Sequence, residues 1–133
     1  MRLVTGSCDN TVRFWRYSQA NASWVEEPKK SNPHTEWVRD VAWAPTSAMP
    51  NNIVASCCED KSVYIWSEVA NSNTGEYEWD CTLLKTFDAP VWRVSWSVTG
   101  NVLAVSTGNS AVTLWKQSTD ESWVQLSSVD EAK

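Results

Sequence analysis

Residues 53–66 read IVASCCEDKSVYIW, and this stretch of sequence recurs twice along the chain. Residues 3–15 read LVTGSCDNTVRFW, and residues 102–115 read VLAVSTGNSAVTLW. The tryptophans that end the three copies are 51 and 49 residues apart, and an Asp or Asn stands six residues before each of them. Self-similarity at a near-constant spacing indicates a repeat architecture in which each copy is part of one structural unit.

Shorter blocks flank these copies and complete the units. VRDVAW at residues 38–43 matches VWRVSW at residues 91–96, and a further tryptophan opens a short segment after each copy. Of the 10 tryptophans, only Trp37 and Trp92 lie outside this common pattern. The apolar runs are short, rich in Val, Ile, Leu, Trp and Tyr, and separated by polar turn residues, which is typical of strands and not of helices.

We therefore predict an all-β chain of three units, the first with three strands and the other two with four each. Tight hairpins are expected at Asp9–Asn10 and Glu59–Lys61, and longer loops at residues 45–52 and 70–78. Four antiparallel strands at this spacing form one blade of a β-propeller, and propellers close with about four to eight blades. An arc of three blades leaves an apolar face bare at each end. We expect such an arc to pair, to aggregate or to belong to a longer chain, so that Met1 is not the natural start of the fold.

Charge and cysteine usage limit the classes of partner and the compartment. The 133 residues carry 11 basic and 16 acidic side chains, for a formal net charge of −5. This balance argues against binding nucleic acid or an anionic membrane, because both need a basic surface. No apolar run approaches the roughly 20 residues of a membrane span, and the sequence starts without the apolar stretch of a signal peptide. We expect a protein of the cytosol or nucleus with four free thiols, at Cys8, Cys57, Cys58 and Cys81.

The units resemble WD repeats, whose hallmark is a buried, hydrogen-bonded tetrad of His, Ser or Thr, Asp and Trp. The second unit matches this tetrad at His34, Ser56, Asp60 and Trp66. A buried carboxylate needs donors and a buried indole N–H needs an acceptor, so the resemblance implies a structural role for these side chains.

The other two units match the tetrad only in part. The first unit keeps Thr5, Asp9 and Trp15, and the third keeps only Trp115. The remaining tetrad positions of the third unit hold Phe87, Val105 and Asn109.

Four longer strings carry a closer resemblance. WVRDVAWAP at residues 37–45, VWRVSWS at 91–97, GNVLAVS at 100–106 and VTLWK at 112–116 resemble the carboxyl-terminal half of the Sec-thirteen family. Members of that family are six-bladed open propellers, without enzymatic activity, in the outer COPII vesicle coat at exit sites of the endoplasmic reticulum and in the Y-shaped scaffold of the nuclear pore. The resemblance implies strands two to four of one blade in residues 1–30, a complete blade in 34–86, the last blade in 87–128 and a tail in 129–133.

The same resemblance implies protein partners. In this family a Sec-thirty-one coat subunit or a nucleoporin donates an extra blade that fills the gap in the ring, and contact with the membrane is peripheral, through the coat. The bare face of the last blade would meet that partner. The period of two along a strand groups Trp92, Val94 and Trp96, to which we add Leu103, as partner-facing candidates. These side chains could instead pack on the preceding blade, and the sequence leaves both arrangements open.

Catalysis is not expected from these residues. The chain has 1 His, which the tetrad already uses, and no glycine-rich phosphate loop or metal-ligand spacing, so no cofactor and no metal is predicted. Neighbouring carboxylates lie in polar contexts that are typical of a solvated surface, at Glu26–Glu27, Asp120–Glu121 and Asp130–Glu131.

An alternative function is that of a WD-repeat adaptor, of the signalling or ubiquitin-ligase type, which binds a peptide motif at the mouth of the propeller channel. Glu36, Trp37 and Arg39 lie near the start of a predicted channel-lining strand and could form such a mouth, or could be ordinary rim residues. The effect of salt on partner binding distinguishes the two functions. A charged contact at the mouth weakens as salt screens it, whereas a buried donated blade responds little.

Overall fold

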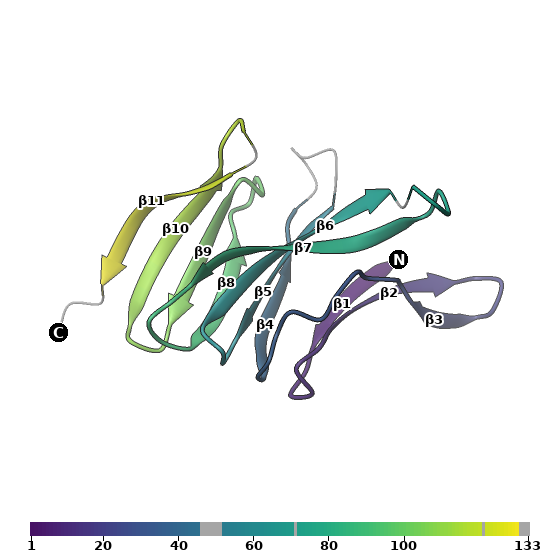
Figure 1. The fold of residues 1–133 in the computed structure, drawn as a ribbon, viewed down its shortest axis with the longest axis horizontal. Coiled ribbons are helices and arrows are strands. Elements are labelled where there is room, and N and C mark those ends of the chain that lie inside the picture. The colour runs from purple at the N-terminus through teal and green to yellow at the C-terminus, as the bar shows by residue number, and fades with distance from the viewer. Residues whose placement is uncertain (46–51, 71, 121, 131–133) are drawn as a thin grey trace.

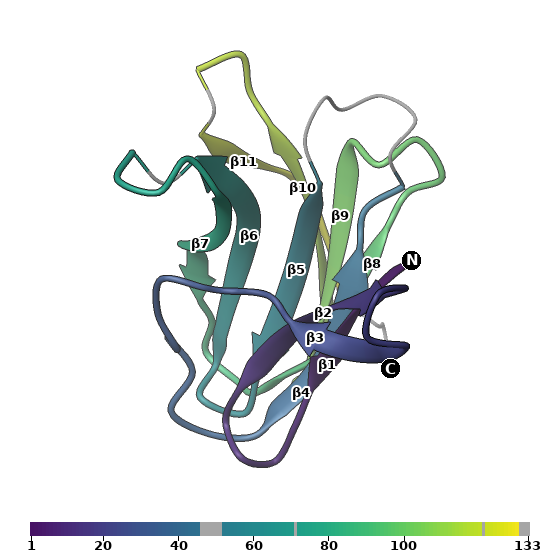
Figure 2. The ribbon, with the colours of Figure 1, turned by 90° about the vertical axis from the view of Figure 1, so that its right-hand side faces the viewer.

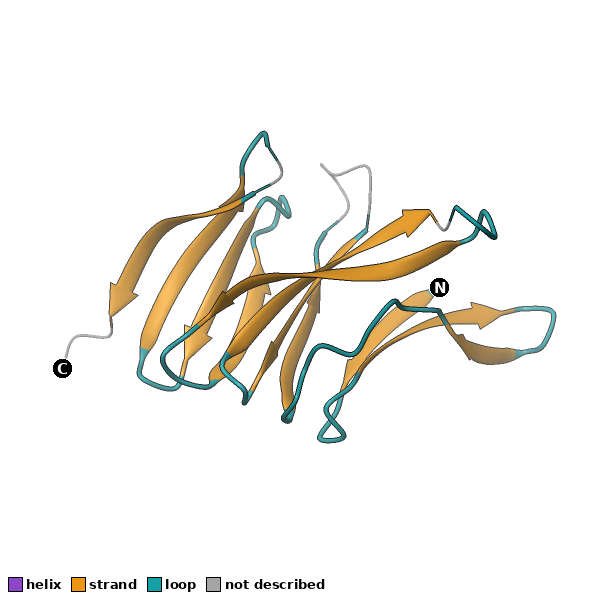
Figure 3. Ribbon diagram, viewed as in Figure 1, coloured by secondary structure: helices purple, strands orange, loops and turns teal. Residues whose placement is uncertain are grey.

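The structure is a computed structural model that describes residues 1–45, 52–70, 72–120 and 122–130. Within these ranges there are eleven strands and no helix, and the strands form three antiparallel sheets that stand side by side (Figures 1 and 3). The all-β fold class that the repeats predict is confirmed.

The first sheet has its strands in the order β1-β2-β3. These strands are β1 (Arg2–Gly6), β2 (Val12–Ser18) and β3 (Ser23–Glu26). Side chains alternate between the two faces of a strand, and in β2 this places Val12 and Phe14 in the core while Arg13 and Trp15 stay more exposed.

The second sheet lies between the other two and has the order β4-β5-β6-β7 (Figures 1 and 2). Its strands are β4 (Val38–Trp43), β5 (Ile53–Cys58), β6 (Ser62–Ala70) and β7 (Tyr77–Thr86). Every residue of β5 is buried, because this strand has a neighbour on each side and another sheet over each face.

The third sheet has the order β11-β10-β9-β8. Its strands are β8 (Val91–Trp96), β9 (Val102–Thr107), β10 (Ala111–Gln117) and β11 (Trp123–Asp130). Strand β11 therefore includes the first two residues of the predicted tail, and residues 131–133 lie outside the described part of the chain.

Aromatic side chains fill the space between the first two sheets. The ring of Phe14 stacks on Trp79, with centroids 4.1 Å apart and planes 9° apart, and it meets Trp66 edge-on at 5.3 Å. Gly6 allows this close approach, because a Cβ at that position would lie 2.6 Å from Cγ1 of Val38. The buried members of this cluster are Val12, Phe14, Val38, Val54, Trp66 and Trp79.

Arg2 joins the same two sheets by charge. Its guanidinium lies 2.8 Å from Glu27 and 2.7 Å from Glu68, and it also lies over the rings of Trp43 and Trp79, 5.4 Å from each centroid. Arg2 thus pairs with two carboxylates and stacks on two indoles, and these four contacts link it to four segments of the chain.

A second apolar cluster joins the second sheet to the third. The polar contacts across this interface come from β4, where Asp40 Oδ2 accepts from the backbone nitrogen of Val94 at 3.2 Å and the carbonyl of Ala42 accepts from Trp96 Nε1 at 3.0 Å. The buried members of the cluster are Ala44, Ile53, Ala55, Cys57, Val63, Ile65, Phe87, Val91, Val94, Leu103, Val105 and Trp115.

Equivalent hairpins connect the middle strands of the three sheets. Asn10, Lys61 and Ser110 each close a turn by donating their backbone N–H to the carbonyl three residues earlier, at 3.2 Å, and they have φ angles of 71°, 73° and 65°. The tight hairpins predicted at Asp9–Asn10 and Glu59–Lys61 are confirmed. The loop predicted at 45–52 falls mostly on residues 46–51, which lie outside the described residues.

Candidate functional site

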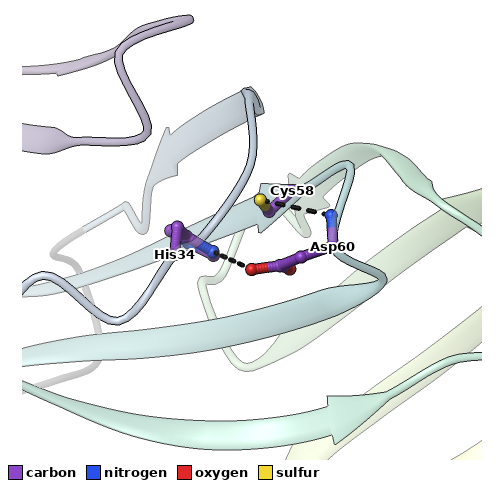
Figure 4. Close-up of side chains that lie close together, drawn as sticks. All are labelled: His34, Cys58 and Asp60. Carbon is purple, nitrogen blue, oxygen red and sulfur yellow. Dashed lines mark hydrogen bonds and ion pairs between the residues drawn. The ribbon is translucent and has the colours of Figure 1, made fainter.

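The structure brings His34, Ser56, Asp60 and Trp66 together inside the second sheet. Trp66 Nε1 donates to Ser56 Oγ at 2.8 Å, and Ser56 Oγ lies 2.7 Å from His34 Nε2. The other ring nitrogen of the imidazole, Nδ1, lies 3.7 Å from Asp60 Oδ2 and 3.3 Å from the hydroxyl of Ser62. Figure 4 shows the imidazole of His34 turned toward the Asp60 carboxylate.

A neutral imidazole satisfies every polar atom of this chain of contacts. Ser56 accepts from the indole of Trp66 and donates to Nε2 of His34, which leaves the Nδ1–H of the ring facing Ser62 and Asp60. Burial lowers the pKa of His34, and the nearby Asp60 charge only partly opposes this effect. The arrangement therefore holds His34 in its uncharged form.

The Asp60 carboxylate is held ionised by hydrogen bonds. Burial raises the pKa of Asp60, but donors from Ser62 and Thr35 outweigh that effect and lower the pKa to about 2. The backbone nitrogens of Ser62 and Thr35 each lie 3.0 Å from a carboxylate oxygen, and the Ser62 hydroxyl also donates to the carboxylate. These bonds tie the loop before β4 to the hairpin between β5 and β6.

Cys58 lies beside His34 and Asp60, and their possible ligand atoms are all within 4.8 Å of one another (Figure 4). A metal would require a thiolate and a free imidazole lone pair. The thiol of Cys58 instead donates to the carbonyl of Glu36 at 3.1 Å, and burial raises its pKa to about 11. Both imidazole nitrogens already have partners, so these contacts suit a structural network better than a metal centre.

The first sheet keeps only part of the tetrad geometry. Trp15 Nε1 donates to Thr5 Oγ1 at 3.2 Å, as the sequence match implies. Asp9 is exposed in the hairpin, where it accepts from the backbone nitrogen of Thr11 at 3.0 Å and lies 3.7 Å from Arg13. The structure thus joins Thr5 to Trp15 and places Asp9 in a separate turn.

In the third sheet a different residue replaces the lost acceptor. Trp115 Nε1 donates to Thr113 Oγ1 at 2.8 Å, in a position where Val105 has no hydroxyl to offer. Phe87, at the histidine position, meets the Trp115 ring edge-on at 6.2 Å, and Asn109 accepts from a hydroxyl of its own hairpin. Sequence reasoning missed Thr113, although a Thr two residues before a buried tryptophan was the available signal.

The partner-facing candidates of the last blade do not lie together on an open face. Val94 and Leu103 are buried against the second sheet, and Trp96 reaches the carbonyl of Ala42 there, so the prediction that these three side chains face a partner is wrong. Val94 and Trp96 do share one side of β8, but this side packs on the second sheet, and a bulge makes Trp92 an extra residue that no longer lies with them. Trp92 itself is 54% exposed.

The face of the third sheet that points away from the second sheet follows from strand register. Val4 pairs with Phe14 in the first sheet, Ala55 with Ile65 in the second and Ala104 with Leu114 in the third. Phe14, Ala55 and Ile65 are buried under the next sheet, whereas the equivalent pair in the third sheet is only half-buried. We call this surface the open face, and its apolar members are Val102, Ala104, Val112, Leu114, Val124 and Leu126.

The residues predicted at the channel mouth lie beside one another at the start of β4. Arg39 stacks over the ring of Trp37 at 5.4 Å and pairs with Glu59 at 2.6 Å, and Glu36 is exposed. Trp37 is 50% exposed, so its ring is available to a ligand.

Several of the neighbouring carboxylates have partners within the chain. Glu26 pairs with Arg13 at 3.2 Å and Glu27 with Arg2 at 2.8 Å, and Asp120 accepts from the backbone nitrogen of Ser122 at 3.2 Å. The side chains of residues 121, 130 and 131 lie outside the described part.

All four cysteines are free thiols, and the described residues include no helix able to cross a membrane.

Three such sheets, each with an equivalent hairpin between its middle strands, and a buried tetrad in the second of them define a WD-repeat protein. The model of the WD domain, G-beta repeat, matches residues 1–16, 26–67 and 81–116, and the chain belongs to this family.

Among curated proteins, the chain is similar to SEC13 homologues of plants and animals. Protein transport protein SEC13 homolog A of Arabidopsis thaliana is 49% identical over 130 residues, which are 97% of this chain and 41% of that protein. Protein SEC13 homolog of Homo sapiens is 45% identical over 133 residues, which are 99% of this chain and 39% of that protein. The resemblance to the Sec-thirteen family is confirmed, and the chain spans about two-fifths of the length of these curated relatives.

Proposed function

We propose that this chain is part of a non-enzymatic scaffold of the COPII vesicle coat, in transport from the endoplasmic reticulum to the Golgi, and of the nuclear-pore scaffold. In this proposal a partner protein covers the open face with a donated blade. The similarity to a protein named as a transport protein supports the first part. The open face supports the second, and it is the single observation on which the proposal rests.

The open face has the composition of a surface that another sheet covers. Three of its members, Ala104, Val112 and Leu114, occupy the same register positions as residues that the next sheet buries in the second unit, namely Ala55, Val63 and Ile65. Completing the burial of Val102, Val112, Leu114, Val124 and Leu126 is worth about 1 kcal/mol for each half-covered side chain, or roughly 5 kcal/mol in all. A gain of that size favours a stable complex over an exposed face.

The occupant is expected to bring strands, since the two covered interfaces of this chain are both sheet against sheet. A set of donated strands with apolar side chains on one face repeats that packing. By resemblance, the partners are a Sec-thirty-one-like coat subunit and a nucleoporin, which would place the protein at exit sites of the endoplasmic reticulum, on COPII vesicles and at the nuclear envelope.

Co-purification with the coat subunit tests the proposal. The chain is co-expressed with a Sec-thirty-one-like subunit, and the complex is followed by size-exclusion chromatography in low salt and in 0.5 M salt. Val112→Glu places a charge on the open face and should abolish the complex, whereas the matched control Val98→Glu, at a loop position that is 91% exposed, should not. Salt should have little effect. A complex that survives Val112→Glu, with folding of the variant verified by circular dichroism, overturns the proposal.

A further inference from the structure

Charged side chains between the sheets of this chain are matched by the sheet that covers them. Arg2 lies between the first two sheets and pairs with Glu68 of the second sheet at 2.7 Å. Asp40 lies between the second sheet and the third, and its Oδ2 accepts from the backbone nitrogen of Val94 in β8 at 3.2 Å. Each of these charges therefore has a polar partner on the neighbouring sheet, which offsets the cost of burying it.

Strand register identifies the residue of the third sheet that is equivalent to Asp40. In the second sheet Asp40 lies in one row of paired residues with Val63, and in the third sheet Arg93 lies in one row with Val112. Residues that are directly paired across an antiparallel sheet share one face of it. Val63 is buried under the third sheet, whereas Val112 is on the open face. Arg93 is thus on the open face, at the position of Asp40 and with the opposite charge.

A second positive charge lies on the open face. Lys116 pairs with Val102 on one side and with Val124 on the other, and both are members of the open face. Arg93 and Lys116 are exposed, and neither forms an ion pair within the described part of the chain. No described side chain in the rows of these two residues is acidic. The open face thus carries two cations whose charges the chain itself does not balance.

A sheet that covers the open face would remove water from both cations. A buried charge is strongly unfavourable unless a group of opposite charge or a set of hydrogen-bond partners replaces the lost water. The carboxylate of Asp40 meets an N–H donor on the next sheet, but a guanidinium has only donors and needs an acceptor. A strand that met Arg93 as β8 meets Asp40 would place a donor against a donor. The covering strand must therefore differ from β8 at this point.

From these contacts we infer that the blade donated to the open face carries one acidic side chain opposite Arg93 and another opposite Lys116. Arg93 binds its carboxylate through two parallel N–H donors, and Lys116 attracts the second as a point charge. A blade with neutral or basic side chains at these positions would leave both cations buried and unpaired, so the two residues select among possible partners. This inference rests on the proposed function, because it names the chemistry of the partner that covers the open face.

Charge substitutions in the complex with a Sec-thirty-one-like coat subunit test the inference. The variants are co-expressed with that subunit, and dissociation of the complex is measured by biolayer interferometry. Arg93→Gln should weaken the complex about thirtyfold or more, mainly through faster dissociation, and Lys116→Gln should weaken it several-fold. Arg93→Lys keeps the charge and should retain more affinity than Arg93→Gln. The matched control Arg16→Gln removes an exposed arginine of the first sheet and should leave the affinity unchanged.

Charge reversal locates the carboxylate on the partner. Arg93→Glu should abolish the complex. Each Asp and Glu in the inserted strands of the coat subunit is then replaced by Arg in turn, and one of these replacements should restore binding to Arg93→Glu. If none of them does, the inference is overturned.

The inference and the proposed function fail in different ways. If folded Arg93→Gln binds the coat subunit as tightly as the unchanged chain while Val112→Glu still abolishes the complex, the donated blade stands and its acidic side chains are refuted. If the complex survives Val112→Glu, the proposed function is overturned and this inference falls with it. Light scattering gives the mass of the complex, and a dimer of this chain that excludes the coat subunit from the open face overturns both.

Discussion

Thr113 Oγ1 accepts a hydrogen bond of 2.8 Å from the indole nitrogen of Trp115, two residues further along the same strand. In the second sheet the equivalent indole is that of Trp66, which donates to Ser56 on the neighbouring strand over the same distance. The third sheet has therefore replaced an acceptor on β9 with one on β10. A buried indole N–H without any acceptor would cost about 1–3 kcal/mol, and the hydrogen bond to Thr113 avoids this cost.

Replacing Thr113 with valine tests this substitute acceptor. Thr113→Val keeps the shape of the side chain and removes the oxygen, so it should lower the free energy of unfolding by about 1–3 kcal/mol. Thr113→Ser keeps the oxygen and should cost less than half of that. Urea denaturation followed by tryptophan fluorescence gives both values. Equal losses for the two variants would show that the methyl group, and not the hydrogen bond, is what matters at this position.

A second prediction concerns the close approach of the first two sheets at Gly6. A Cβ there would lie 2.6 Å from Cγ1 of Val38 and 3.1 Å from Cγ1 of Val41, so Gly6→Ala should destabilise the chain by about 1–3 kcal/mol through overpacking. The cost should shrink when Val38→Ala removes the clashing methyl groups. A double-mutant cycle in urea measures this coupling. Additive losses would mean that the two sheets separate instead of competing for the same space.

The spacing of the repeats was sufficient to predict the three sheets, because Asp9, Asp60 and Asn109 stand at the same distance before their tryptophans and mark equivalent hairpins. The residues of the tetrad in the second unit were also predictable, since each of the four is the residue type that the resemblance requires. The boundaries of individual blades stay a prediction.

Two features were not predicted from the sequence, and each has a physical reason. The bulge at Trp92 removes this residue from the side of β8 that Val94 and Trp96 share, and an unpaired extra residue has no marker in a run such as VWRVSW. Thr113 replaces an acceptor from another strand, and a Thr two residues before a tryptophan is a weak signal that does not show which hydroxyl the indole meets.

Cysteine reactivity should separate the exposed thiol from the buried ones. Burial raises the pKa of Cys57, and it raises the pKa of Cys58 to about 11, so both stay protonated and shielded at neutral pH. Because the thiolate is the nucleophile, brief treatment with iodoacetamide should label exposed Cys8 first. Mass spectrometry of the native chain gives the order of labelling, with the urea-unfolded chain as control. Early labelling of Cys58 would indicate a lower pKa and would reopen the case for a metal at His34, Cys58 and Asp60.

Acid should weaken the network at Asp60. Its pKa is lowered from 3.8 to about 2, so the folded form binds its proton more weakly than the unfolded chain does. The stabilisation, about 2 kcal/mol, is fully present above pH 4 and is lost as the pH falls toward 2. Asp60→Asn should therefore be less stable than the unchanged chain at pH 7, with the gap closing between pH 4 and pH 2. Asp88→Asn, at an exposed position, is the matched control for loss of a carboxylate and should change stability at pH 7 much less.

Protonation of His34 should cause a separate loss of stability, at a higher pH than the loss due to Asp60. Burial lowers its pKa below the value of 6.5 that an unfolded chain has, so the unfolded form takes up a proton first as the pH falls. The free energy of unfolding should then decrease below about pH 6.5, by at most about 1.4 kcal/mol per pH unit for this one group. His34→Gln, which cannot be protonated, should remove the slope while lowering stability at pH 8. Urea titrations between pH 8 and pH 5 measure both effects. If stability instead rises on acidification, attraction between a charged imidazole and Asp60 exceeds the cost of burying the charge, and the neutral network described here is wrong.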